Sequence, residues 1–347
     1  QCPMLFLLSI FLFLSCSVFS QKYDAILNIF VTFNGVILVA NQGKIEYLKG
    51  IGVANRQEGI LINPQTKFRI CSITKTFTAV LILQLMEEGK LQLTDKISKY
   101  LLDYQGEGKD KVNLHHLLTY SSGIENLDQN NEIMYALKWP LDSIVRKYCS
   151  GKLVSEPGAQ FSYKNADYIL LGKIIEAITK KPFEQALKER ILDKVGLKNS
   201  GLLSNRQIVK GLTNSYLYDS TAKSFMNDDP YWIENFYASG AMYSTAEDLL
   251  KFDQAIFKNQ LLSKTGTELM LKSYSELWYV AYGFWVSENT FVDRKIRCAD
   301  RQGSISGSNT SWLHLIDENK TFIIFSNTDA VKLNDLRTEL VEASLGK

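Results

Sequence analysis

Segments with the apolar alternation of β-strands occur near both ends of the chain and bracket a middle that largely lacks them. Residues 36–40 and 44–54 are predicted to form a hairpin around a turn at residues 41–43, and residues 66–70 add a short strand. Four further strands are predicted at residues 282–289, 291–301, 311–317 and 321–327. Burying both sets favours one antiparallel sheet flanked by helices, with a mostly helical region inserted between them. The predicted fold class is therefore α/β, of the α+β type.

The middle of the chain is predicted to be helical. Its most apolar helix follows Ser72, stays apolar until Glu87 and has Gly89 as a stop signal. We expect residues 21–71 and 235–347 to form the sheet region and residues 72–234 the helical region, together one catalytic domain. The helix after Ser72 would then begin where the two regions meet, which is where ligand clefts tend to form.

The composition narrows the class of partner. The chain has 347 residues, is 46% hydrophobic and carries a net charge of +2. These values suit a large core, in one domain or two interleaved ones, and provide no basic field for nucleic acid. We expect a small-molecule or peptide substrate and no nucleic-acid partner, and the composition leaves the oligomeric state open.

The N-terminal segment predicts export. An apolar run from Met4 onward is followed by small residues, and cleavage after Ser20 would make Gln21 the mature N-terminus. The triplet that ends at Cys16 loosely resembles a lipoprotein signal, so lipidation there is an alternative. About 17 apolar residues are marginal for a membrane span. We expect residues 1–20 to be a signal peptide, the protein to be periplasmic or secreted, and no stable span to remain after cleavage.

Cysteine and histidine usage gives no sign of a disulfide framework or a metal site. Removal of the signal would leave three widely spaced cysteines, whose redox state stays open. The three histidines lack the spacing of metal ligands. The neighbours His115 and His116 would point to different faces of a helix, which favours packing or capping over ligation.

Ser72 and Lys75 form a Ser-x-x-Lys pair that has two interpretations. Serine is a favoured N-cap, so Ser72 could simply begin the helix that follows it. On a helix, residues three apart share a face, so Lys75 could instead act as a base for a nucleophilic Ser72. Burial in an apolar helix would lower the pKa of this lysine and favour that role.

Two later segments offer partners for this pair. Tyr163 and Asn165 form the one Tyr-x-Asn of the chain, and the tyrosine could act as a base if nearby cations lowered its pKa. Arg301 could supply one such cation from a strand edge, while Gly303 would allow close backbone approach and Ser304 a backbone N–H for an oxyanion. The Lys-Thr-Gly sequence at residues 264–266 lies in a turn leading into a helix and is rejected for this role.

The three motifs, called boxes below, are Ser72–Lys75, Tyr163–Asn165 and Arg301–Gly303. In their order and rough spacing, they resemble those of serine hydrolases related to class C β-lactamases, D-alanyl-D-alanine carboxypeptidases and esterases of the same fold. The resemblance covers nearly the whole chain from about residue 34 and includes VNLHHLLTYSSGI, ASGAMYSTAEDLLKF and SWLHLIDENKTFIIFSN. It implies a β-lactamase/transpeptidase-like fold and a reaction through an acyl-enzyme. It implies no metal and no organic cofactor.

The resemblance also implies a role for each box. Ser72 would be the nucleophile, and Lys75, alone or with Tyr163, would accept its proton. Tyr163 would also protonate the leaving group, and Asn165 would hold the amide carbonyl of the substrate. The remaining substrate-binding residues are expected to be Arg301, Gly303 and Ser304, with the backbone N–H groups of Ser72 and Ser304 as the oxyanion hole.

One departure from the family pattern keeps a second function open. A Lys or His usually opens the third box, whereas this chain has Arg301, which keeps the charge and suits a carboxylate but does not pass a proton at neutral pH. A catalytically weak or inactive relative that binds peptidoglycan-like or other carbonyl ligands is therefore the alternative. A Ser-His-Asp hydrolase is disfavoured, because no Gly-x-Ser-x-Gly occurs. The boxes do not separate ester, D-amino-acid peptide and β-lactam substrates.

Overall fold

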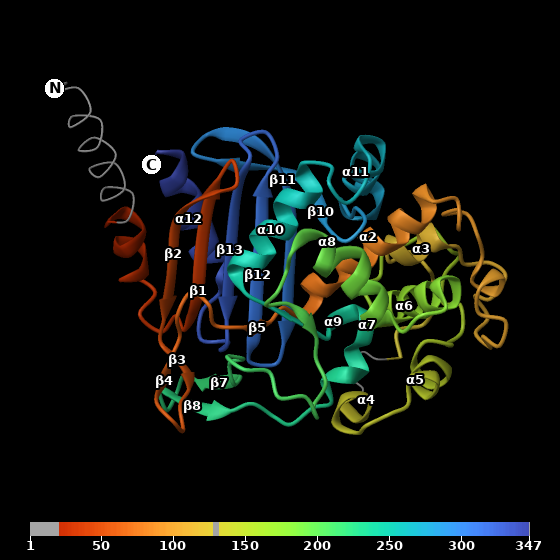
Figure 1. Ribbon diagram of the computed structural model, residues 1–347, viewed down its shortest axis with the longest axis horizontal. Helices are drawn as coiled ribbons and strands as arrows, with labels where there is room; N and C mark the ends of the chain where they lie inside the picture. Colours follow the sequence, from red (N-terminus) through yellow and green to blue (C-terminus); the bar gives the residue numbers. More distant parts are fainter. Residues whose placement is uncertain (1–20, 128–131, 347) are drawn as a thin grey trace.

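A six-stranded antiparallel sheet forms one side of the molecule (Figure 1). The computed structural model describes residues 21–127 and 132–346, so the predicted signal peptide and Cys16 lie outside the described residues. The strands lie in the order β10-β11-β12-β13-β1-β2, with every neighbouring pair antiparallel. Their bounds are β1 (Gly35–Asn41), β2 (Lys44–Ile51), β10 (Trp285–Phe291), β11 (Arg294–Ile305), β12 (Ser308–Leu315) and β13 (Lys320–Ser326). Both chain ends thus contribute to one sheet, which confirms the predicted fold class.

Both faces of this sheet are covered. Alternate side chains of β1 enter two different cores, Val36 and Leu38 on one side and Ile37 and Val39 on the other. The first core contains α2 (Thr74–Glu87) and α10 (Ala246–Phe257), and the second contains α12 (Leu333–Leu345) and the helical residues 21–27. A strand covered on both faces needs an unbroken apolar sequence, which explains the run VILVA.

The helical region is built around α2, which lies between the sheet and the other helices (Figure 1). Nearly every side chain of α2 is buried, because α6 and α9 pack on it in addition to the sheet side. No helix in residues 21–127 and 132–346 has the length and apolar character to cross a membrane. The other helices here are α3 (Leu114–Leu118), α4 (Glu132–Ala136), α5 (Leu141–Tyr148), α6 (Asn165–Thr179), α7 (Phe183–Leu187), α8 (Asp193–Val195) and α9 (Tyr237–Gly240), with α11 (Lys264–Met270) near β10.

Several strand predictions had inaccurate bounds. The strand expected at residues 66–70 is only β5 (Phe68–Arg69), which pairs with β9 (Met242–Ser244). Conversely, β11 does not end near Arg301 but continues to Ile305. Short strands also occur elsewhere, namely β3 (Val53–Asn55), β4 (Ile60–Leu61), β6 (Gly201–Leu202), β7 (Tyr216–Asp219) and β8 (Ser224–Asn227).

A buried polar cluster fastens α10 to the sheet. The carboxyl group of Asp253 accepts hydrogen bonds from Trp312 Nε1 at 2.8 Å and Thr321 Oγ1 at 2.8 Å, and His314 Nδ1 lies 3.0 Å from the same group. His314 also stacks on Phe257, with ring centroids 3.5 Å apart. His314 is therefore held in the core by a hydrogen bond and by ring stacking.

We predict that Asp253→Ala strongly destabilises the fold. The substitution leaves three buried polar groups without their acceptor, so the free energy of unfolding should fall by roughly 3 kcal/mol or more. Denaturant unfolding measures this change. The control is Asp317→Ala, an exposed aspartate at the β12–β13 turn, which should change the stability by less than about 0.5 kcal/mol. Equal effects of the two substitutions would contradict a structural role of the cluster.

Candidate active site

Ser72 lies in a tight turn that precedes α2 rather than at the helix cap. The turn is a 3-10 helix (Cys71–Ile73), and the N-cap position of α2 is Ile73, which makes no side-chain cap hydrogen bond. Cys71 enters this turn with a positive φ of 49°, a conformation that is uncommon for residues other than glycine. The capping interpretation of Ser72 is therefore wrong, and its hydroxyl is directed to two other side chains.

Lys75 is completely buried and faces three oxygens. Its Nζ donates to Ser72 Oγ at 3.1 Å, to Asn165 Oδ1 at 2.7 Å and to the carbonyl oxygen of Ser239 at 2.7 Å. The apolar packing of α2 holds the stem of Lys75, so the position of Nζ is fixed from both ends.

Tyr163 completes the contacts of the Ser72 hydroxyl. Its hydroxyl lies 2.7 Å from Ser72 Oγ and accepts a hydrogen bond from Arg301 Nη2 at 3.2 Å, although the residue as a whole is 36% exposed. Burial of the hydroxyl on its own raises the pKa of Tyr163. The charges of Lys75 and Arg301 outweigh that effect and lower the pKa to about 8. The expected pair of cations around this tyrosine is therefore present.

Asn165 is the first residue of α6 and links two elements. Its Oδ1 accepts from Lys75, and its Nδ2 donates to the hydroxyl of Tyr135 at 2.9 Å. Tyr135 comes from α4 and stacks on Phe236 with centroids 4.0 Å apart. The amide of Asn165 is thus oriented from both ends, with its nitrogen side toward Tyr135.

Arg301 is not placed as the predicted carboxylate clamp. It is completely buried, and its guanidinium donates to the Ser72 carbonyl oxygen at 2.8 Å and to the hydroxyls of Tyr120 and Tyr163, each at 3.2 Å. The physical reason is the alternation of β11, in which Arg301 and Gly303 point inward while Gln302 is exposed. We therefore revise the expectation: Arg301 supports the backbone of Ser72 and the hydroxyl of Tyr163.

Gly303 lies at the closest approach of β11 to the turn that holds Ser72. A Cβ on Gly303 would lie 2.7 Å from the backbone nitrogen of Ser72 and 2.9 Å from Cys71 Cβ, so only glycine fits without movement. Pairing of β11 with β10 ends at Asp300, which leaves the following residues of β11 open on that side. Ser304 is exposed next to this opening.

A cleft of about 880 Å³ lies beside Ser72. The predicted site residues that line it are Ser72, Tyr163, Gly303 and Ser304. The other three lie outside the lining: Lys75 contacts Ser72 and Asn165, and Arg301 contacts Tyr163. Its other lining residues are two aromatic side chains, parts of β11 and β12, and the segment before and within α12, namely Phe161, Trp285, Asp300, Gln302, Asn309, Thr310, Asp329, Val331, Lys332, Leu333, Asn334 and Asp335.

The remaining candidates of the sequence analysis lie elsewhere and have structural contacts. His116 takes part in the capping box of α3, and His115 Nδ1 lies 2.7 Å from the hydroxyl of Tyr282. Lys264 begins α11 on the surface, so the rejection of its Lys-Thr-Gly sequence is confirmed. Cys71, Cys149 and Cys298 are buried, and none of the three takes part in a disulfide. Within residues 21–127 and 132–346, no cluster of three or more His, Cys, Asp or Glu side chains is arranged to hold a metal ion.

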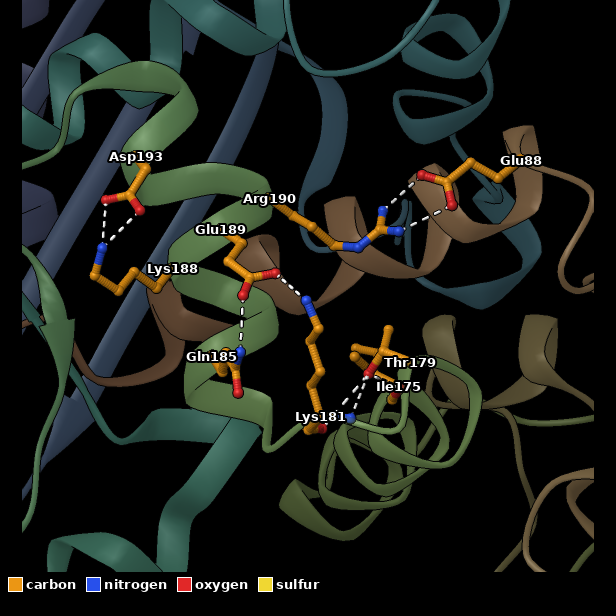
Figure 2. Close-up of polar contacts among 9 residues, drawn as sticks. All are labelled: Glu88, Ile175, Thr179, Lys181, Gln185, Lys188, Glu189, Arg190 and Asp193. Atoms are coloured by element: carbon orange, nitrogen blue, oxygen red, sulfur yellow. Dashed lines mark hydrogen bonds and ion pairs between the residues drawn. The ribbon is translucent and has the colours of Figure 1, made fainter.

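A second, highly charged cleft of about 620 Å³ lies between the ends of α2 and α6 and the π-helical turn Lys188–Leu192 (Figure 2). Several of its charges are paired with one another. Arg190 binds both carboxylate oxygens of Glu88, at 2.7 and 2.9 Å, and Lys181 pairs with Glu189 at 2.5 Å. None of the predicted site residues lines this cleft, and its ion pairs join α2 to the segment after α7.

Comparison with known proteins identifies the family of the chain. The Beta-lactamase family model matches residues 29–344. The chain belongs to the Beta-lactamase family. It is similar to a penicillin-binding protein of Bacillus subtilis (strain 168), with 26% identity over 319 residues that cover 86% of this chain and 68% of the relative. It is also similar to a teichoic acid D-alanine hydrolase of Staphylococcus aureus (strain MRSA252), with 28% identity, 73% of this chain and 62% of the relative covered.

A solved structure of a penicillin-binding protein has a similar fold. A penicillin-binding protein from Bacillus halodurans superposes with a TM-score of 0.79 at 25% identity, covering 93% of this chain and 98% of that one. The chain spans only about two thirds of the length of the curated relatives above. Membership of the Beta-lactamase family rests on the match over residues 29–344, and it leaves the substrate open.

Sequence reasoning missed several residues of this Beta-lactamase family site. Tyr120, Tyr135 and the carbonyl of Ser239 contact the predicted residues directly. The only signal for Tyr120 was its place within the family-like phrase VNLHHLLTYSSGI. The contacts of Tyr135 and Ser239 join segments more than 25 residues apart in sequence, and no local pattern marks them.

We predict that one tyrosine of the protein ionises near pH 8. Tyr163 has its pKa lowered to about 8, whereas most other buried tyrosines have theirs raised, so a phenolate signal should appear well before the rest. Ultraviolet difference titration measures it, and Tyr163→Phe should remove it while leaving the higher transitions. A signal near pH 8 that persists in Tyr163→Phe would contradict the assignment.

Proposed function

We propose that the protein is a serine hydrolase that forms an acyl-enzyme on Ser72. The observation that carries this proposal is the placement of the Ser72 hydroxyl between Lys75 Nζ at 3.1 Å and the Tyr163 hydroxyl at 2.7 Å, at the mouth of a cleft. A serine hydroxyl becomes nucleophilic when a base is within hydrogen-bond reach. The named relatives, among them a D-alanine hydrolase, support hydrolysis as the reaction class.

We propose that Tyr163 rather than Lys75 accepts the proton. Lys75 Nζ already donates to Asn165 Oδ1 and to the Ser239 carbonyl oxygen, each at 2.7 Å, which suits a positioning role. The Tyr163 phenolate, with its pKa lowered to about 8, can accept a proton near neutral pH. Lys75 then acts by holding Ser72 and stabilising the phenolate.

The proposed reaction has two halves. Ser72 Oγ attacks the carbonyl carbon of the substrate while its proton passes to the Tyr163 phenolate, and the resulting oxyanion lies near the backbone N–H groups of Ser72 and Ser304. Tyr163 returns the proton to the leaving group as its bond to carbon breaks, which leaves an ester on Ser72. Water then attacks this ester with Tyr163 accepting its proton, and Tyr163 returns that proton to Ser72 Oγ as the bond between Oγ and the acyl carbon breaks and the acid product leaves.

The substrate class proposed is an ester or amide of a D-amino acid, or a related small acyl group. The D-alanine hydrolase relative supports it. The buried position of Arg301 supports a substrate without a required carboxylate, because this guanidinium already donates to three oxygens inside the protein. Asn165 lies beside Lys75, outside the residues that line the cleft, so it would need to exchange its contact with Tyr135 to bind the amide carbonyl of such a substrate.

We expect the wild-type protein to gain the mass of an acyl group on brief exposure to an activated ester or a D-alanyl thioester. Ser72→Ala should gain none, and intact-mass spectrometry separates the two. The acylation rate should rise with pH through about 8, because the reactive form has Tyr163 ionised, and it should fall about tenfold for each pH unit below that value. Absence of any adduct on the wild type would favour the non-catalytic binding protein instead.

We also propose that the protein is exported. The apolar run in residues 4–20 supports this, although it lies outside the described residues. In a bacterial host, we expect the protein recovered outside the cytoplasm to begin at Gln21 on N-terminal sequencing. A lipidated N-terminus at Cys16 would indicate anchoring, and retention of the apolar run in a cytoplasmic protein would contradict export.

A further inference from the structure

One guanidinium connects the nucleophile, the base and a third residue, Tyr120. Arg301 donates through Nε to the Ser72 carbonyl oxygen at 2.8 Å, through Nη2 to the Tyr163 hydroxyl at 3.2 Å, and through Nη1 to the Tyr120 hydroxyl at 3.2 Å. The donors of a guanidinium lie in one rigid plane, so fixing any two contacts constrains the third. Tyr120 is the one of these three partners that lies outside the proposed chemistry.

The position of Tyr120 is itself strongly constrained. The residue is completely buried and has a positive φ of 53°, a conformation that persists only where surrounding contacts enforce it. Its ring lies 4.7 Å from the Tyr163 ring, 5.1 Å from Tyr168 and 6.1 Å from Trp285, measured between centroids. Its carbonyl oxygen accepts from the backbone nitrogen of Ser162 at 2.8 Å, one residue before the base.

We infer that Tyr120 is a positioning residue that acts through Arg301: its hydroxyl fixes the guanidinium plane so that Nη2 stays on Tyr163 and Nε on the Ser72 carbonyl. The inference rests on the proposed function, in which Tyr163 is the base, and deepens it. Without the hydroxyl, Nη1 would be left buried with no acceptor at that position, which is unfavourable for a charged donor. The guanidinium would then turn toward other acceptors, and its contact with Tyr163 would lengthen.

The groups that face the Tyr163 hydroxyl determine how far its pKa shifts when the Tyr120 hydroxyl is removed. The charged ones are Lys75 from α2 and Arg301 from β11, and both favour the phenolate. The uncharged ones are Ser72 and, on the side of α3 and α6, the hydroxyls of Tyr120 and Tyr168. Loosening Arg301 leaves Lys75 in place, so the pKa of Tyr163 should rise only part of the way toward that of an ordinary tyrosine.

The test is Tyr120→Phe, which removes one oxygen and keeps the ring. In ultraviolet difference titration, we expect the Tyr163 transition to move up by roughly one pH unit. Acylation by an activated ester should slow about tenfold at neutral pH, with little change in substrate KM. The matched control is Tyr104→Phe, which removes another buried hydroxyl, one that donates to the Cys149 carbonyl oxygen at 2.7 Å. A purely structural role would lower the melting temperature of both variants and leave the Tyr163 transition unchanged.

A double-mutant cycle with Arg301→Lys decides whether the effect passes through Arg301. Lysine keeps the charge but lacks the fork that reaches Ser72, Tyr120 and Tyr163 together, so Tyr120→Phe should have little further effect in that background. The same effect in both backgrounds would overturn the inference, as would an unmoved Tyr163 transition in folded Tyr120→Phe. If Tyr120→Phe does not fold, Arg301→Lys tests the contact between Arg301 and Tyr163 on which the inference depends, and an unchanged Tyr163 transition there would overturn it.

The titration separates this inference from the proposed function. It follows the ionisation of Tyr163 and requires no turnover, with Tyr163→Phe identifying the signal. If wild type forms no acyl adduct but the transition still moves with Tyr120→Phe, the proposed function fails and the Tyr120–Arg301 link stands. If wild type is acylated and the transition does not move, the proposed function stands and the link fails.

Discussion

The structure depends on the burial of two positive charges, Lys75 and Arg301, around one hydroxyl. Both side chains are completely buried, and a buried cation is tolerated only where oxygens replace the water it has lost. The oxygens come from segments far apart in sequence, including the carbonyls of Ser72 and Ser239 and the hydroxyl of Tyr120. Any fold of this chain that failed to bring these segments together would leave a buried cation without hydrogen-bond acceptors. The site and the fold therefore specify each other.

Two glycines make these approaches possible. Gly303 lets β11 come close to the turn at Ser72, since a Cβ there would lie 2.7 Å from the Ser72 nitrogen. Gly172 in α6 does the same for α9, because a Cβ on it would lie 2.5 Å from Ala238 Cβ, next to the residue whose carbonyl receives Lys75. The second contact brings α9 close enough for the Ser239 oxygen to reach Nζ. Small residues in sequence thus mark the places where the interior charges gain their acceptors.

The sequence predicted those parts of the site that depend on local spacing. Ser72 and Lys75 are three apart, a spacing that brings their side chains together on a helical turn, and the alternating strands at both chain ends indicated one antiparallel sheet. It did not predict the direction of Arg301, because a shift of one residue turns a strand side chain to the opposite face. The stretch Arg301 to Ser304 has no apolar alternation that would settle the choice. Tyr120 was missed for a related reason, since its contact with Arg301 spans 181 residues.

Arginine at position 301 also affects how the site responds to pH. Histidine in the same place would lose its charge close to pH 6.5, below the range in which Tyr163 ionises. Arginine stays protonated throughout that range, so the phenolate of Tyr163 keeps its partner at every pH where it forms. The same property prevents Arg301 from relaying a proton, so in the proposed reaction Tyr163 accepts and returns the proton alone. In that proposal, a guanidinium held in place by Tyr120 gives a fixed charge and a fixed geometry, and proton transfer is left to a single residue.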